Sequence, residues 1–177
     1  QGVPNSLHQV ASTFDTFIYS ALQGSTPIGR TAAAGMFQSV CCCATILLAN
    51  GKNNTDVHAY IKENLVPGGT VYLLGGTSAL PASLETGLDG FKVVRLYGNT
   101  RYATNLAILK EAGVKDQEIL ICTGVDFADS LSASATGLPI LLVNNITGEL
   151  TADQITFLKS TSGKFTIVGG ESAIGTD

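Results

Sequence analysis

A nearly repeated pair of motifs constrains the fold of this chain more than any other feature. The motif Ile-Leu-Leu-x-Asn occurs at 46–50 and again at 140–144, and Gly-Gly-x-Ser-Ala occurs at 75–79 and again at 169–173. Both recur at one offset, because 140 − 46 and 169 − 75 each equal 94. Two motifs that keep the same register indicate a duplicated module. Such a module more often supplies repeated binding surface than one asymmetric catalytic site.

The repeat divides the chain near residues 89 and 90. We expect two domains, a first module over 1–89 and a second module over 90–177. The first module matches the second mainly from Ile46 onward and is degenerate before that. Because the second Gly-Gly motif lies close to residue 177, we expect the second module to be truncated at its C-terminus.

Short apolar runs alternate with helical patterns along the chain. Strands are predicted at 17–19, 45–48, 71–74, 92–96, 119–122, 140–143 and 165–168. Continuous apolar runs are typical of strands that are buried on both faces of a parallel sheet. Helices are predicted at 56–65, 102–112 and 151–159, the last with a capping box of Thr151 and Gln154. This alternation predicts an α/β fold with mostly parallel sheets flanked by helices.

Composition excludes several classes of function. Hydrophobic residues make up 45% of the 177-residue chain and charged residues 14%, which is typical of a chain that folds around a core. The net charge of −4, with ten scattered basic residues, argues against a nucleic-acid surface made by bulk charge. No apolar run is long enough to span a bilayer, and no signal peptide is evident at Gln1. We expect neither a nucleic-acid partner nor membrane insertion.

The four cysteines form no pattern of disulfides or metal ligands. Cys41, Cys42 and Cys43 are consecutive, and Cys122 stands alone. Adjacent Cα atoms lie about 3.8 Å apart, which is shorter than the usual span of about 4.4–6.8 Å across a disulfide bond. No Cys/His spacing of a metal site occurs, so we expect no metal. The cysteines are interpreted as small buried hydrophobes, since no nearby positive charge favours a thiolate.

The Gly-Gly motifs at 75–79 and 169–173 leave two interpretations open. A glycine-rich turn between a strand and a helix can cradle a phosphate with backbone amides, although neither copy is a dinucleotide-binding or P-loop motif. Alternatively, the motif is a tight turn in which glycine adopts a positive φ and lets a helix approach closely. The second interpretation is favoured, because α/β folds use such turns with or without a ligand.

No catalytic constellation is evident. Asp126 and Asp129 follow a predicted strand and invite a general acid/base or metal hypothesis. The corresponding first-module stretch at 21–30 has no acid, so both are interpreted as caps of a helix beginning near residue 130. His8 and His58 lack the neighbours of a catalytic triad. We expect no catalytic residues and no cofactor.

The segment 95–104 is the densest in ligand-binding side-chain types. Arg95 and Arg101 flank a glycine turn, and Tyr97 and Tyr102 lie beside them. Guanidinium groups suit phosphate or carboxylate anions, and tyrosine rings suit the faces of sugars. We name Arg95, Arg101 and Tyr102 as candidate ligand contacts. The alternative is an inter-module staple, in which Arg101 pairs with an acid while Tyr102 packs.

These motifs together resemble a known family. The pattern Arg-x-x-Gly-x-x-Arg-Tyr-x-Thr at 95–104 looks like the signature of the cell wall-binding repeat 2 family of Gram-positive surface proteins. The segment 123–131 is similar to the family's Ser-Gly-x-Asn-Phe-Pro-Asp-Ala-Leu loop, and the Pro-Ile-Leu-Leu strand at 139–142 and the Gly-Gly turn follow in order. The resemblance covers 91–174, and 46–96 in the first module.

The resemblance implies secreted proteins held on the cell wall by tandem repeats, which bind an anionic secondary wall polymer without catalysis or a covalent bond. It implies Toprim-like or Rossmann-like modules, three of which usually pack around a pseudo-threefold axis. Since this chain holds about two modules, further repeats or copies would complete that arrangement. The family's anchoring motif corresponds to these residues: Ile46, Leu47, Leu48, Ile140, Leu141 and Leu142. As strand residues these are expected to be buried, so a role in anchoring could act through the fold.

We therefore expect a tandem pair of cell wall-binding modules from a bacterial surface protein. An alternative is a domain or enzyme that binds a nucleotide or phosphate ligand with the Gly-Gly turns. A third possibility is a purely structural spacer that binds neither the wall nor a small molecule.

Overall fold

The structure is a computed structural model that describes residues 14–21, 45–49, 55–126, 128–144, 146, 149–171 and 174. In the first two strands it describes only the side chains of Leu47 and Ala49. Several sequence expectations lie outside the described residues, namely those on His8, on Cys41, Cys42 and Cys43, and on the first-module stretch at 21–30 beyond its first residue.

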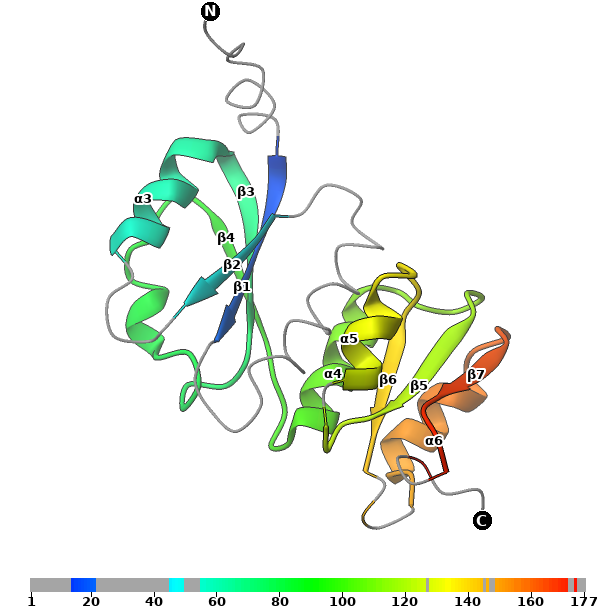
Figure 1. Cartoon of the computed structure of the whole chain (residues 1–177). Coiled ribbons are helices and arrows are strands. Elements are labelled where there is room, and N and C mark those ends of the chain that lie inside the picture. Colours follow the sequence, from blue (N-terminus) through cyan, green and yellow to red (C-terminus); the bar gives the residue numbers. More distant parts are fainter. Residues whose placement is uncertain are drawn as a thin grey trace, which may run out of the picture.

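The first half of the chain forms a four-stranded sheet in the order β2-β1-β3-β4 (Figure 1). Its strands are β1 (Phe14–Ala21), β2 (Thr45–Ala49), β3 (Leu65–Leu74) and β4 (Lys92–Leu96). All neighbouring strands are parallel. β3 therefore lies inside this sheet, with β1 on one side and β4 on the other.

The second half forms a separate parallel sheet of three strands in the order β6-β5-β7. Its strands are β5 (Ile119–Thr123), β6 (Ile140–Val143) and β7 (Phe165–Val168). Because the chain moves to opposite sides of β5, the right-handed crossover rule puts the two connecting helices on opposite faces of this sheet. In the described part of the chain, β6 and β7 are its edge strands.

Helices connect the strands in both halves. They are α3 (Thr55–Asn64), a short 3-10 helix η1 (Ala82–Leu84), α4 (Arg101–Glu111), α5 (Ala128–Ser134) and α6 (Ala152–Lys159). The capping box predicted for α6 is present, with Thr151 accepting from the Gln154 amide and the Gln154 side chain accepting from the Thr151 amide. The expected α/β fold, with parallel sheets flanked by helices, is confirmed.

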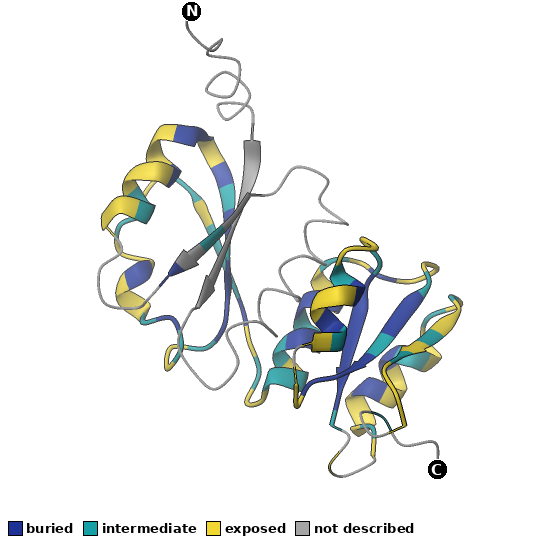
Figure 2. Cartoon of the chain, in the orientation of Figure 1, coloured by how far each residue is buried: buried dark blue, intermediate teal, exposed yellow. Residues whose placement is uncertain are grey.

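Each sheet has its own hydrophobic core among the described residues. The core of the first half consists of Ala49, Ile61, Leu65, Val71, Leu73, Leu80, Leu84 and Leu88. The core of the second half is centred on β5 and β6 and includes Leu106 and Leu109 from α4 and Phe157 from α6. Figure 2 shows β6 buried along its length, whereas β7 is exposed at alternate residues.

All the predicted strands are present, but β3 is longer than predicted. It begins at Leu65, directly after α3, rather than at Val71. Leu65 pairs with Phe14, and an irregularity in the register precedes the regular ladder that begins at Thr70. The chain leaves the first sheet only after Leu96. The domain division at residues 89 and 90 stays a prediction.

Candidate ligand-binding site

Residues 95–104, which we call the junction segment, lead from the end of β4 into the first turn of α4. They connect the carboxyl edge of the first sheet with the carboxyl edge of the second. Thr100 is the N-cap of α4, and its side chain accepts a hydrogen bond from the Ala103 amide at 3.1 Å. Gly98 donates its amide to Thr104 Oγ1 at 2.9 Å, which closes the loop onto the helix.

Arg95 is bound inside the first half. Its Nη1 donates to the carbonyl oxygens of Gly75 at 2.8 Å and Leu80 at 2.9 Å, and its Nε donates to Glu85 Oε1 at 2.7 Å. Its Nη2 lies 2.7 Å from the same carboxylate oxygen as an ion pair, without the alignment of a hydrogen bond. Only 12% of the side chain is exposed. Arg95 therefore fastens the Gly-Gly turn and η1 to β4.

Arg101 and Tyr102 contact the loop that follows β5. The Nη1 of Arg101 donates to the Gly124 carbonyl at 2.7 Å, which ties the first turn of α4 to this loop, and the pairing of Arg101 with an acid stays a prediction. A Cβ on Gly124 would lie 2.5 Å from Cε1 of Tyr102, so the ring requires glycine there. Tyr102 packs against the core of the second half. The junction segment is thus anchored at both ends.

Tyr97 is the tyrosine that the junction segment presents to solvent. It is 58% exposed. Its ring lies beside the Gly-Gly turn, with Cδ2 3.5 Å from the position that a Cβ on Gly76 would take. From the sequence, Tyr102 and not Tyr97 was predicted to contact the ligand. Spacing alone does not tell which of the two rings faces the core.

Three backbone amides at the first Gly-Gly turn are hydrogen-bonded within the first half. The Gly75 amide donates to the Leu96 carbonyl at 2.9 Å, and the amides of Ala79 and Leu80 both donate to the Gly76 carbonyl. The φ of Gly75 is 144° and that of Gly169 is 136°. The tight-turn interpretation, with glycine at a positive φ, is confirmed for the first residue of both motifs.

The Ile-Leu-Leu residues of the second half are core residues. Ile140, Leu141 and Leu142 are buried in β6. In the first half, Leu47 packs half-buried against the core, while the side chains of Ile46 and Leu48 lie outside the described ones. A wall polymer cannot reach the buried residues of the folded domain, so their part in anchoring stays a proposal that would act through the fold.

The buried amides of Asn105 and Gln154 hold the outer edge of β6. Asn105 donates to the Ile140 carbonyl at 2.9 Å and accepts from the Leu142 amide at 2.9 Å, and Gln154 donates to the Leu142 carbonyl at 2.8 Å. These side chains take the place of a neighbouring strand. The only signal for this role in the amino-acid sequence is one amide in the apolar pattern of the predicted helix 102–112.

Three of the side chains considered as catalytic or reactive in the sequence can be placed in the structure. Burial, and after it the charge of Asp129, raises the pKa of the Cys122 thiol to about 11, which fits an inert buried cysteine. Asp129 lies in the first turn of α5, as the helix-start interpretation expects. The Nε2 of His58 lies 3.0 Å from the Leu84 carbonyl, so this histidine links α3 to η1.

The described residues bring together no group of three or more His, Cys, Asp or Glu side chains that could hold a metal ion. None of the helices in the same part of the chain has the length and apolarity needed to cross a membrane.

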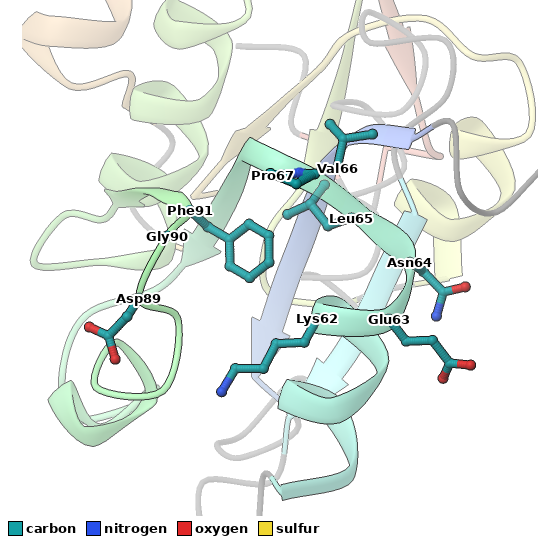
Figure 3. A pocket seen from close by; sticks show the side chains of 9 residues that line it. All are labelled: Lys62, Glu63, Asn64, Leu65, Val66, Pro67, Asp89, Gly90 and Phe91. Atoms are coloured by element: carbon teal, nitrogen blue, oxygen red, sulfur yellow. The ribbon is translucent and has the colours of Figure 1, made fainter.

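A pocket of about 420 Å³ lies away from the junction segment, where α3 ends and β3 begins (Figure 3). Its lining residues are Lys62, Glu63, Asn64, Leu65, Val66, Pro67, Asp89, Gly90 and Phe91. Sequence reasoning did not single out any of them as a site, because they carry no motif and meet only in the folded chain.

Fold and site together define a mixed α/β chain with parallel sheets flanked by helices and a junction rich in Arg and Tyr. Residues 95–177 match the model of the family described as Cell wall binding domain 2 (CWB2). The match begins at Arg95, the first residue of the junction segment. This part of the chain therefore matches that family, and the resemblance drawn from its motifs is confirmed over these residues.

Solved structures extend the likeness of fold to the whole chain. Cwp8 from Clostridium difficile is similar with a TM-score of 0.72 and 25% identity, over 98% of this chain and 31% of that chain. Cwp6 from Clostridium difficile is similar with a TM-score of 0.73 and 20% identity, over 99% of this chain and 29% of that chain. The chain thus spans less than a third of either protein. No curated protein matches the sequence.

Proposed function

We propose that this chain attaches its protein to the cell wall of a Gram-positive bacterium without catalysis and without a covalent bond. The observation that carries the proposal is the match of residues 95–177 to a family whose name describes cell wall binding. The fold shared with Cwp8 and Cwp6 supports it. The same proposal places the protein outside the cell, at the wall.

We propose an anionic secondary wall polymer as the ligand. Arg101 is half-exposed at the junction segment, and a guanidinium can form paired hydrogen bonds with phosphate or carboxylate. Tyr97 adds an exposed ring on the same segment. Arg95 and Tyr102 would support this surface from beneath, because one fastens the Gly-Gly turn and the other packs on the core.

Sedimentation with purified cell walls tests the proposal. Wild-type protein should sediment at low salt and be released as salt rises, since exposed charge pairs are screened. Arg101→Gln should weaken binding by about tenfold, the effect of losing a charge-assisted hydrogen bond. Lys110→Gln removes the same charge from an exposed site on α4 and serves as the matched control.

The outcomes separate the parts of this proposal. If wild-type protein does not sediment with walls or with their extracted anionic polymer, the proposed function is wrong. If it binds regardless of salt, the role of Arg101 is wrong. Circular dichroism of Arg101→Gln checks that the loss of its bond to Gly124 leaves the fold intact.

The same preparation tests the nucleotide alternative. In the first Gly-Gly turn the Gly75 amide donates to the Leu96 carbonyl, so this amide is not available to bind a phosphate. A thermal-shift screen with nucleotides and divalent metals should therefore give no rise in melting temperature. A saturable rise would favour the alternative, because a true ligand stabilises the folded state by mass action.

Completion of a threefold arrangement by further repeats or copies is a separate proposal. The separation of the described cores into one for each sheet supports modules that pack as units. Light scattering of the chain over a range of concentrations measures whether copies associate.

A further inference from the structure

The pocket at the end of α3 combines an apolar wall with a polar rim (Figure 3). The ring of Phe91 stands at its mouth, half-buried and packed on the core of the first half. Leu65, Val66 and Pro67 continue the wall. A volume of about 420 Å³ falls within the range of small-molecule sites.

The backbone around this pocket is held in place. The Gly68 amide donates to the Gly90 carbonyl at 3.0 Å, which ties the loop before β4 to the start of β3. The side-chain amide of Asn64 is turned to the Tyr60 carbonyl at 2.8 Å and is part of the helix end. A ligand would therefore meet a preformed cleft rather than a loose loop.

The rim offers both a donor and acceptors. Lys62 and Asp89 are exposed on the lining and make no hydrogen bond or ion pair to another described residue. With Glu63, the lining carries two carboxylates against one ammonium. The carboxyl end of a helix also carries a partial negative charge. This balance disfavours a phosphate or another anion and favours a neutral ligand that donates hydrogen bonds.

We propose that this pocket binds one neutral sugar ring, with an apolar face on Phe91 and hydroxyl groups on Asp89 and Lys62. The identity of the sugar as part of a wall polymer rests on the proposed function. The pocket would add a second contact to that polymer, distinct in chemistry from Arg101. Arg101 at the junction segment would bind the anionic groups of the polymer, and the pocket would bind the uncharged sugar rings of the polymer.

Titration of the full chain by two-dimensional NMR tests the pocket. The probes are methyl glycosides of hexoses and N-acetylhexosamines, with inorganic phosphate as the comparison. At least one sugar should cause saturable shifts of the Gly68, Gly90 and Phe91 amides, with a Kd of about 1 mM, the weak end of specific binding. Phosphate should leave these amides unchanged.

Two surface variants test which groups act. Asp89→Asn should weaken sugar binding by about tenfold, because it replaces a charged acceptor. Lys62→Ala should weaken sugar binding by a smaller factor. Asp153→Asn and Lys110→Ala make the same charge changes on exposed residues outside the pocket and should have no effect.

The result that overturns the inference is the absence of saturable shifts with every sugar, or equal binding by phosphate, or binding that Asp89→Asn does not weaken. Wall sedimentation separates this failure from failure of the proposed function. If the protein sediments with walls but does not bind free sugars, only the proposed sugar site is wrong. If the protein does not sediment with walls at all, the proposed anchoring function is wrong.

Discussion

The strands β3 and β7 occupy the same position in the sequence repeat but differ in burial. Val71 and Leu73 of β3 are fully buried, each with 0% exposure. Their counterparts 94 residues later, Phe165 and Ile167 of β7, are 42% and 60% exposed. β3 lies between β1 and β4, whereas β7 is an edge strand in the described part of the chain.

The residues that follow each strand explain the difference. After β3, the chain returns through Leu80, Leu84 and Leu88 over the strand and then adds β4 beside it. After β7, the described residues supply Ile174, which packs partly against the core of the second half. Equal motifs therefore do not ensure equal burial, because a strand's environment comes from what covers it.

Truncation of the paired residues should break this comparison most clearly. Leu73→Ala should lower the free energy of unfolding by about 2–5 kcal/mol, because it leaves a cavity in a packed core. Ile167→Ala should change the same quantity by no more than about 0.5 kcal/mol, as expected of an exposed side chain. Urea unfolding of both variants measures the difference.

A large cost for Ile167→Ala would show that β7 is covered in solution. An exposed edge strand with apolar side chains is a natural surface for pairing with another strand. Sedimentation velocity at several concentrations would then show whether copies of the chain supply the cover, with Leu131→Ala as an exposed apolar control on α5.

The two edges of the second sheet extend the comparison. β6 is closed by the amides of Asn105 and Gln154, whereas no described strand pairs with the outer edge of β7. Asn105→Ala should cost about 2–4 kcal/mol, because it leaves two buried backbone groups without their partner. Asn105→Asp should cost at least as much at neutral pH, because it buries a carboxylate that has no donor for the Ile140 carbonyl.

Asn99→Ala is the matched control for this prediction, because Asn99 is exposed on the junction segment. Asn99→Ala should change the free energy of unfolding very little, as measured for both variants by thermal or urea unfolding. Equal tolerance of the two alanine variants would mean that the β6 edge does not depend on the Asn105 amide.

Local patterns were enough to predict most of the secondary structure. Continuous apolar runs located the strands, and the β4, β6 and β7 boundaries agree with the prediction. The α6 capping box was also readable, because Thr151 and Gln154 are three residues apart. The β3 boundary was wrong because the Pro-Gly-Gly stretch at 67–69 reads as a turn although the strand runs through it.

The parts of the site that escaped prediction depend on distant contacts. Arg95 pairs with Glu85, Gly75 and Leu80, and no spacing rule links these positions. The pocket at Phe91 likewise joins a helix end to a loop more than twenty residues later. Residue types were enough to select 95–104 as the candidate ligand-binding segment. Only the fold shows which side chains of this segment face solvent.

The smallest expected effect concerns the polar position that β3 and β7 share. Tyr72 of β3 donates to Glu111 at 3.3 Å, and its counterpart Thr166 of β7 donates to Glu118. The Thr166 hydrogen bond lowers the pKa of Glu118 below its ordinary value against the opposing effect of burial, and Lys164 adds a lesser lowering effect. A carboxyl whose pKa is lower in the folded than in the unfolded state stabilises the fold above its unfolded value.

That stabilisation should be lost as pH falls through the lowered pKa of Glu118. Thr166→Val removes the donor, so the urea midpoint should fall slightly at neutral pH, and the deficit should shrink as pH falls and the carboxyl becomes protonated in both the folded and the unfolded state. Thr161→Val is the control, because its hydroxyl donates to the Leu158 carbonyl and its effect should not vary with pH. A deficit that stays constant from neutral to acid pH would mean that Thr166 stabilises β7 by packing rather than through Glu118.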